Sequence, residues 1–249
     1  MTHHRQKDRR YVQHRPQLFY TTDPAPCPYL PGRLERKLIT ALGGPDADLL
    51  HDRLALAGFR RSHSMAYTPA CANCRACMSL RIPVKHFQPN RTQQKLFRRH
   101  SDISVTLHPP IPTEEQFNLF QIYQTARHAD GEMVSMSWDD YSAMIAHTPI
   151  PTYVVEFRTT YDELVCVSLI DALSDGLSAV YTFYNPTSKA DSWGTYSILW
   201  LIHYAKLIKL PQLYLGYYVP GSPKMAYKAR FEPAEVFHNG HWGPLPPVP

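Results

Sequence analysis

Three cysteines within seven residues, Cys71, Cys74 and Cys77, form the densest group of potential metal ligands in the chain. Thiolates two residues apart can turn toward one soft cation, so this spacing is typical of a zinc or iron–sulfur site in a reducing compartment. Cys27, which lies between prolines, is the expected fourth ligand, because Cys166 sits in an apolar run where a free cysteine is usually a small core residue. The alternative is a tight turn of reduced thiols, and the spacing leaves both open.

Basic residues are separated from acidic ones along the chain. The stretch from Arg53 to Ser101 contains ten Lys or Arg and no Asp or Glu, and the stretch from Ser192 to Phe231 contains five bases and no acid. Clustered cations without neutralising partners are typical of surfaces that bind a phosphate backbone, and neighbouring aromatic and His side chains could stack on unpaired bases. The alternative is a solvated basic face without a partner.

Composition and apolar patterning indicate a globular protein. The chain has 249 residues, of which 44% are hydrophobic, enough for a substantial core. No apolar run approaches the ~20 residues that span a bilayer. Residues 1–10 are charged and polar with no apolar run after them, so we expect no signal peptide. We therefore expect a cytoplasmic protein with no membrane partner, and the sequence leaves its oligomeric state open.

Periodicity, caps and turn residues predict an α+β fold that positions these side chains. Helices are expected at 47–57, 92–99, 113–126, 139–147 and 195–207, and strands at 59–67, 78–84, 152–158, 164–172, 177–184 and 212–217. The cysteine turn would then join the first two strands. The last strand–helix–strand run implies a parallel pair with a crossover helix, so the C-terminal half is expected to contain a mixed sheet.

Ordered sequence blocks in the C-terminal half resemble one family. They are VSLID (167–171), DGLSAVYTFYNP (175–186), GTYSILW (194–200) and YLGYYVPGSPKMAYK (214–228). The family is the aminoacyl-tRNA–protein transferases of the arginyltransferase type. CPYLPG (27–32), GFRRS (58–62) and the cysteine turn resemble the N-terminal half of its compact bacterial branch. The resemblance covers about residues 26–235.

The resemblance implies an acetyltransferase-like (GNAT) mixed sheet with flanking helices in residues 111–249, preceded by a smaller cysteine-containing α+β domain in residues 1–110. It also implies an aminoacyl-tRNA donor in place of coenzyme A. The sequence supports that substitution independently, because it lacks the [Gln/Arg]-x-x-Gly-x-[Gly/Ala] loop that holds the coenzyme A pyrophosphate at a helix N-terminus. No cofactor is expected for the transfer itself.

For the bacterial branch, the resemblance implies transfer of leucine from leucyl-tRNA to proteins that begin with Asp or Glu, which marks them for degradation. An aminoacyl ester is already activated, so the site must mainly orient the acceptor's α-amine and stabilise the oxyanion. Asp171, at the end of an apolar strand, is the expected proton acceptor, and the alternative is a structural carboxylate at a strand end. The basic helix would bind the tRNA. Its candidate residues are Arg91, Lys95, Arg98 and Arg99.

The acceptor's side-chain carboxylate calls for a fixed cation, which Lys224, Lys228, Arg230 or Arg91 could supply. Lys224 and Lys228 would face one pocket if Pro223 opened a helix, and the alternative is that they bind tRNA phosphate. Tyrosines are expected to line this acceptor and aminoacyl pocket, unless they are core residues with satisfied hydroxyls. The candidates are Tyr181, Tyr184, Tyr217 and Tyr227.

Two further family positions carry no assigned role. The block RHADG (127–131) matches the family, but its role is not readable from spacing. Asn185 departs from the family, which more often has Asp before the proline that follows, so a carboxylate function at this position is in doubt.

Other functional classes compete with this interpretation. A zinc nucleobase deaminase needs a glutamate upstream of its Pro-Cys-x-x-Cys motif, and no acid lies between Arg53 and Ser101. A noncatalytic RNA-binding module built on the cysteines would share the thiols and the basic stretch, but it leaves the C-terminal blocks without a role. An arginyl donor in the same transfer reaction stays open, because a leucine pocket is only a few apolar side chains.

Overall fold

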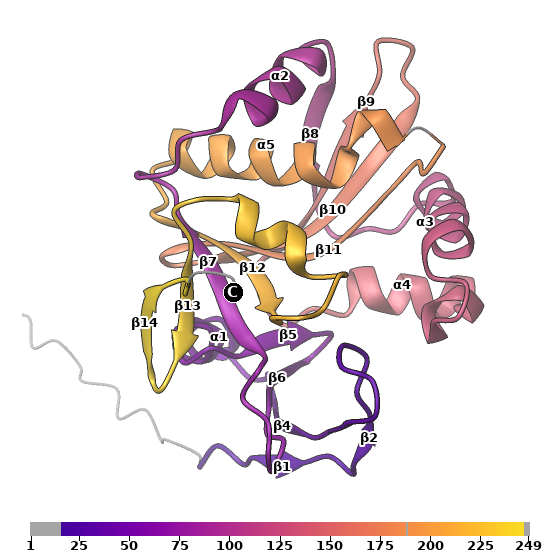
Figure 1. Cartoon of the computed structure of the whole chain (residues 1–249). Helices are drawn as coiled ribbons and strands as arrows, with labels where there is room; N and C mark the ends of the chain where they lie inside the picture. Colours follow the sequence, from indigo (N-terminus) through magenta and orange to yellow (C-terminus); the bar gives the residue numbers. More distant parts are fainter. Residues whose placement is uncertain (1–15, 188, 247–249) are drawn as a thin grey trace, which may run out of the picture.

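An eight-stranded mixed sheet forms the centre of the molecule, with strand order β14-β13-β7-β12-β11-β10-β9-β8 (Figure 1). The computed structural model describes residues 16–187 and 189–246; residues 1–10, on which the expectation of no signal peptide falls, lie outside the described residues. A separate four-stranded sheet has the order β1-β4-β6-β5, and β2 pairs with β3. The described part of the chain contains no helix that is long and apolar enough to cross a membrane.

The helices follow the sequence expectations closely. The α-helices are α1 (Ala47–Leu56), α2 (Arg91–Arg99), α3 (Glu114–Arg127), α4 (Trp138–Ala146) and α5 (Trp193–Leu207), and the 3-10 helices are η1 (Glu132–Ser135), η2 (Lys189–Asp191) and η3 (Ala226–Arg230). A capping box begins α3: the Thr113 side chain accepts from the Gln116 N–H, and the Gln116 side chain accepts from the Thr113 N–H.

The strands divide between the two sheets. They are β1 (Tyr20–Thr21), β2 (Ala25–Pro26), β3 (Leu34–Glu35), β4 (Lys37–Ala41), β5 (Arg60–Ser62), β6 (Met65–Pro69), β7 (Met78–Pro83), β8 (Ser104–His108), β9 (Thr152–Arg158), β10 (Leu164–Leu173), β11 (Gly176–Tyr184), β12 (Gln212–Tyr218), β13 (Glu235–His238) and β14 (His241–Pro244). The expected single strand at 59–67 is wrong: the chain reverses at His63, whose φ is +53°, and β5 and β6 form an antiparallel hairpin.

The predicted mixed sheet is confirmed. Strands β9, β10 and β11 pair antiparallel, and α5 carries the chain from β11 to the parallel strand β12. Helices α2 and α5 pack on one face of the sheet around Leu201 and Leu213, while α3 and α4 pack on the other around Phe120 and Phe183. The α+β fold with a mixed sheet and flanking helices is therefore as expected.

The N-terminal half contributes two strands to this central sheet. β7 lies between β12 and β13, and β8 forms the far edge beside β9. The cysteine turn lies between β6 and β7, as expected, but those strands belong to different sheets. The domain boundary at residue 110 stays a prediction, and strands from both sides of it share the sheet.

A buried ionic network joins the β5–β6 hairpin to the central sheet. The Arg61 guanidinium donates to both carboxylate oxygens of Asp171 on β10, at 2.7 and 2.6 Å. The Thr152 hydroxyl donates to the same carboxylate at 2.9 Å, and His51 Nε2 of α1 lies 3.6 Å from it. Burial alone would raise the pKa of Asp171, but contacts with His51 and Arg61 hold that pKa below its usual value. The carboxylate is therefore a charged structural junction between four elements.

We expect Asp171→Ala to lower the free energy of unfolding by about 3–5 kcal/mol, because removing one partner leaves the Arg61 charge buried and unpaired. Urea denaturation at pH 7 measures this, with the surface variant Asp23→Ala as a control expected to change stability by less than about 0.5 kcal/mol. Since the pKa of Asp171 is lowered on folding, its contribution is present above pH ~4 and is lost as the pH falls toward the folded-state value. Equal stabilities of the two variants would contradict the assignment.

Candidate functional site

Strands β11 and β12 separate after a short parallel stretch. Their pairing runs from Gly176 opposite Gln212 to Ser178 opposite Tyr214 and stops there. Backbone groups beyond that point need other partners, since a buried carbonyl without a hydrogen bond is costly. Two cations supply them: Arg60 Nη2 donates to the Ala179 carbonyl of β11 at 2.6 Å, and Lys228 Nζ donates to the Tyr217 carbonyl of β12 at 2.7 Å.

The two cations reach the end of the β11–β12 pairing, which we call the opening, from different elements. Arg60 and Arg61 are consecutive residues of β5, and successive side chains of a strand point to opposite sides. Arg61 therefore points to Asp171 while Arg60 points into the opening between β11 and β12. Lys228 comes from η3, the short helix that follows β12 (Figure 1).

Gly216 lies at the meeting point of the two cations. Its φ is +80°, a conformation that favours glycine, and a Cβ built there would lie 3.4 Å from the Arg60 guanidinium and 3.5 Å from Lys228 Nζ. A side chain at this position would be strained by the backbone conformation, and its Cβ would touch both groups at ordinary contact distance. The glycine thus serves the backbone conformation of β12 at the point where both cationic groups contact it.

The pair is buried without a counter-ion. Arg60 is 8% exposed and Lys228 is 6% exposed, and neither forms an ion pair with any residue that the structure describes. Burial, aided by the charge of Arg60, lowers the pKa of Lys228 to about 7. Buried charges normally require a partner, so this arrangement is typical of a site that binds an anion or handles a proton.

Aromatic side chains from three elements surround the opening. The Tyr227 ring centroid lies 6.0 Å from Lys228 Nζ. Tyr184 of β11 packs 4.8 Å from Tyr123 of α3, centroid to centroid, and its hydroxyl accepts a hydrogen bond from Arg127 at 3.2 Å. Burial, with the neighbouring Tyr184, raises the pKa of Tyr227 and of Tyr123, so these phenols are neutral hydrogen-bonding groups at physiological pH.

The RHADG block (127–131) lies at this same place. Helix α3 ends at Arg127, and His128 is its C-cap. Burial lowers the pKa of His128, and the charges of Lys224 and Arg127 lower it further, which places the end of α3 beside the segment before η3. The block therefore belongs to the wall of the opening, a role that its spacing did not reveal.

Four of the predicted pocket residues gather here, and three do not. Tyr184, Lys224, Tyr227 and Lys228 belong to the opening. The Tyr181 hydroxyl instead accepts from Gln124 Nε2 at 2.6 Å, and the Tyr217 hydroxyl donates to the Tyr67 carbonyl at 3.0 Å on the cysteine side. The Arg230 side chain is exposed, and its carbonyl accepts from Gln93 Nε2 of α2 at 2.9 Å.

Pro223 does not open a helix, so the condition for Lys224 and Lys228 to face one pocket is not met. The helix in this segment is the 3-10 helix η3, which begins at Ala226, so Lys224 precedes it. Lys224 is exposed whereas Lys228 is buried. The two lysines therefore do not form a pair on one helical turn.

The predicted role of Asp171 as proton acceptor does not fit its geometry. Its side chain is fully buried, and both oxygens are bonded to Arg61, with Thr152 as a further donor. A base must be within hydrogen-bond reach of the substrate and free to take its proton. A strand-end carboxylate that holds Arg61 in place is the alternative that the contacts favour.

Arg60 is the site residue that sequence reasoning missed. In the sequence, Arg60 is one of ten bases in the acid-free stretch. The signal that could separate it from Arg61 is that neighbouring side chains of a strand point to opposite sides. Using this signal requires knowing that Arg61 contacts the buried Asp171. Tyr123 of α3 is a second residue of this region that was not among the predicted site residues, and it packs against Tyr184.

All four predicted basic tRNA ligands lie exposed on α2. An Asn90 capping box fixes the start of this helix, and Gln93 ties it to η3 through the Arg230 carbonyl. Arg99 Nη1 also donates to the Ala190 carbonyl at 2.6 Å. The basic helix is thereby attached to the element that carries Lys228.

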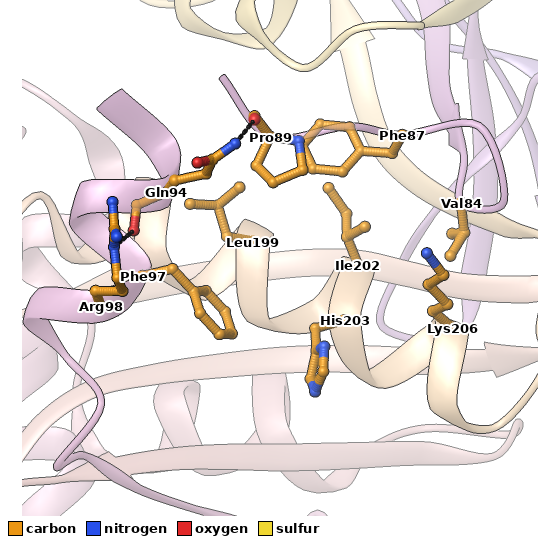
Figure 2. Close-up of a pocket in the computed structure, with 10 residues that line it drawn as sticks. All are labelled: Val84, Phe87, Pro89, Gln94, Phe97, Arg98, Leu199, Ile202, His203 and Lys206. Carbon is orange, nitrogen blue, oxygen red and sulfur yellow. Dashed lines mark hydrogen bonds between the residues drawn. The ribbon is translucent and has the colours of Figure 1, made fainter. Parts of the chain in front are cut away.

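A cavity of about 400 Å³ is lined by residues of α2, of α5 and of the segment before α2 (Figure 2). Its apolar wall includes Phe87, Phe97 and Leu199, and Figure 2 shows polar groups of Arg98 and His203 around it. The full lining is Val84, Phe87, Pro89, Gln94, Phe97, Arg98, Leu199, Ile202, His203 and Lys206. An apolar, aromatic cavity with cations at its edge has the character of a site for a flat base attached to phosphate.

The four predicted metal-ligand cysteines line one small cavity of about 70 Å³. Burial, with the neighbouring thiols, raises the pKa of Cys77 to about 12, while a backbone hydrogen bond from Ala76 lowers that of Cys74. Cys71 exchanges hydrogen bonds with the Arg36 backbone, and Cys74 accepts from Arg33 at 3.2 Å. The donor types suit zinc or an iron–sulfur cluster, but within residues 16–187 and 189–246 no three Cys, His, Asp or Glu side chains are arranged as ligands of one metal.

Two family models match the chain. The C-terminal model of arginine-tRNA-protein transferase matches residues 115–238, and the N-terminal model of the same family matches residues 25–95. The second match contains Arg60, and the first contains Tyr123, Arg127 and Lys228. Residues from both family models therefore meet at the opening between β11 and β12.

Curated relatives match nearly the whole chain. An aspartate/glutamate leucyltransferase of Gluconobacter oxydans is 61% identical over 94% of this chain and 98% of the relative, and one of Gluconacetobacter diazotrophicus is 58% identical over 93% and 89%. Among solved structures, the C-terminal domain of a putative lysylphosphatidylglycerol synthetase from Agrobacterium fabrum is 11% identical, with a TM-score of 0.49 over 83% of this chain and 65% of that one. The matches along both halves and the high identities place the chain in the arginine-tRNA-protein transferase family, among relatives named aspartate/glutamate leucyltransferase.

Proposed function

We propose that this protein transfers leucine from leucyl-tRNA to the α-amine of proteins that begin with Asp or Glu. The observation that carries the proposal is the buried pair Arg60 and Lys228, which meets no acid in the described structure, in a chain whose relatives are named for aspartate, glutamate and leucine. An N-terminal Asp or Glu brings the missing carboxylate. Leucine added in this way would mark the acceptor for degradation, as the family resemblance implies.

Arg60 is the group best suited to hold the acceptor's carboxylate. Its planar guanidinium carries five N–H donors, and one of its nitrogens donates to the Ala179 carbonyl, so other donors are free for a charged hydrogen bond. Lys224 and Arg127, which are exposed at the edge of the opening, would attract the acidic N-terminus from solvent. The acceptor's α-amine would then lie near Lys228.

The reaction itself needs little covalent catalysis. An aminoacyl ester is already activated, so holding the α-amine about 3–3.5 Å from the ester carbonyl supplies much of the rate enhancement. Arg60 and any protonated Lys228 would also stabilise negative charge that develops on the carbonyl oxygen. The opening between the strands thus combines positioning with positive charge in a buried setting.

The donor tRNA is expected to lie along α2. Arg91, Lys95, Arg98 and Arg99 project from this helix into solvent, and phosphate contacts need such unpaired surface cations. The cavity beside Phe97 and His203 could take an unpaired base of the same tRNA. The bond between Gln93 and Arg230 then couples the tRNA-binding helix to the segment that carries Lys228.

A metal on the cysteines remains a separate proposal. The thiols share one cavity, and a soft cation would draw them together as a structural support away from Lys228. Zinc and iron analysis of anaerobically purified protein tests it. One equivalent of zinc or an iron content typical of a cluster per protein, lost in Cys71→Ser, would support the metal site. Protein that contains neither metal would leave an ordinary turn of reduced thiols.

Purified protein incubated with charged leucyl-, arginyl- or phenylalanyl-tRNA and short peptides tests the proposed function. We expect leucine on peptides that begin with Asp or Glu and none on peptides that begin with Ala or Arg, because only the former bring a carboxylate to Arg60. Mass spectrometry of the peptides measures the product. Arginine transfer would correct the donor alone, and no conjugation from any donor would overturn the enzyme proposal in favour of a noncatalytic RNA-binding protein.

Arg60→Gln is expected to raise KM for peptides beginning with Asp or Glu by roughly 10- to 100-fold, the scale of a lost charged hydrogen bond. Glutamine keeps a donor for the Ala179 carbonyl, so the fold is expected to survive, and thermal melting checks this. Arg53→Ala, which removes an exposed arginine of α1, is the control and is expected to leave KM unchanged. An unchanged KM for Arg60→Gln would remove the residue from the acceptor site.

Replacing Arg91, Lys95 and Arg98 together by Ala is expected to weaken tRNA binding and to flatten its salt dependence. Each lost phosphate contact lowers the slope of log K against log salt by about 0.7–0.9. Binding of uncharged tRNA measured between 50 and 200 mM salt gives the slope. The control is a triple variant with the same change in charge, in which Arg36, Arg53 and Arg75 are replaced by Ala. It is expected to keep most of the wild-type slope of log K against log salt. Equal slopes for the two triple variants would place the tRNA away from α2.

A further inference from the structure

Lys228 combines burial with an incomplete set of partners. It is 6% exposed, and its Nζ donates one hydrogen bond, to the Tyr217 carbonyl at 2.7 Å. A neutral lysine amine has two N–H groups and one lone pair. A bond to Tyr217 fixes the position of the nitrogen and leaves its lone pair available to accept a proton.

The groups that face Lys228 disfavour its protonated form. Arg60 of β5 adds a positive charge, Tyr217 of β12 supplies a neutral carbonyl, and Tyr227 of η3 supplies an aromatic ring. No carboxylate in residues 16–187 or 189–246 forms an ion pair with Lys228. Burial and the Arg60 charge lower the pKa of Lys228 to about 7, so its neutral form is well populated at physiological pH.

Arg60 and Lys228 therefore suit different tasks although both are buried bases. A guanidinium stays protonated and gives a fixed positive charge, whereas a lysine amine in a buried, positively charged setting can lose its proton. The pairing matches a site that holds an anion on one group and moves a proton through the other.

We propose that Lys228 accepts the proton that the acceptor's α-amine loses during leucine transfer and passes it to the departing ribose oxygen. This inference rests on the proposed function. The neutral α-amine attacks the ester carbonyl carbon, and a C–N bond forms while the nitrogen gives its proton to Lys228 Nζ. The C–O bond to the ribose then breaks, and Lys228 returns the proton to that oxygen. The products are an amide and a ribose hydroxyl, and Lys228 ends neutral.

The pH dependence of single-turnover transfer at saturating peptide and leucyl-tRNA tests the proposal. We expect the wild-type rate to rise with pH through a value near 7, in addition to the titration of the peptide's own α-amine near ~8. Lys228→Met keeps the unbranched apolar part of the side chain and removes the amine. Its rate is expected to fall about 10²–10⁴-fold, the usual range for proton-transfer catalysis, and to lose the rise with pH near 7. Peptide KM is expected to change by less than about threefold.

Two more variants separate a proton acceptor from a fixed cation. Lys228→Arg keeps the charge and cannot release its proton near pH 7, so we expect it to be as slow as Lys228→Met. Lys228→Ala is expected to regain activity when methylamine or ethylamine is added, because a small amine can occupy the vacated space. Lys85→Met, an exposed lysine outside the site, is the control and is expected to behave as wild type.

The outcomes distinguish this inference from the proposed function. Full activity in Lys228→Arg, or an unchanged pH profile in Lys228→Met, would overturn the proton-transfer role while leucine transfer by the wild type stood. No transfer by the wild type would overturn the proposed function itself. Thermal melting shows whether each variant is folded, and a wild-type profile without a limb near 7 would overturn the inference even if no variant folded.

Discussion

The bidentate contact between Arg61 and Asp171 is the interaction on which the rest of the site depends. It joins the β5–β6 hairpin to β10 in a fully buried setting, where a misplaced charge would be costly. Because successive side chains of a strand point in opposite directions, anchoring Arg61 also fixes the direction of Arg60. One ion pair thus holds the hairpin on the sheet and aims the neighbouring guanidinium at the gap beside β11. The carboxylate thereby positions Arg60 through Arg61.

The end of the pairing between β11 and β12 determines the electrostatic setting of the site. Parallel pairing between β11 and β12 ends at Ser178 and Tyr214. Beyond this point, the backbone carbonyls of Ala179 and Tyr217 accept hydrogen bonds from side chains. Those side chains are cations from outside the two strands, and both lie beside Gly216, whose φ of +80° favours glycine. Where backbone pairing between the two strands ends, the sheet therefore has a buried, positively charged region. Such a region favours a bound carboxylate and at the same time lowers the proton affinity of Lys228.

Local patterns in the sequence predicted most of the fold and less of the site. Helix caps, apolar alternation and the strand–helix–strand spacing are properties of neighbouring residues, so α3, α5 and the β9–β12 strands could be read directly. The burial of Asp171 could not, because its partner Arg61 lies 110 positions away. Lys228 was predicted as a pocket residue, but its isolation from acids depends on the three-dimensional arrangement. Pro223 suggested the start of a helix that would place Lys224 and Lys228 on one face. The chain instead continues through a turn and forms a 3-10 helix only from Ala226.

The central position of β7 has a consequence for how the chain reaches its native state. Both strands that pair with β7, β12 and β13, lie more than a hundred residues later in the sequence. During synthesis β7 is therefore complete long before either partner leaves the ribosome, and its two edges stay unpaired during that interval. Closure of such distant contacts is slow, and exposed strand edges favour association between chains. The nascent protein is consequently most vulnerable to aggregation before its last strands emerge, and its sheet is completed only near the end of translation.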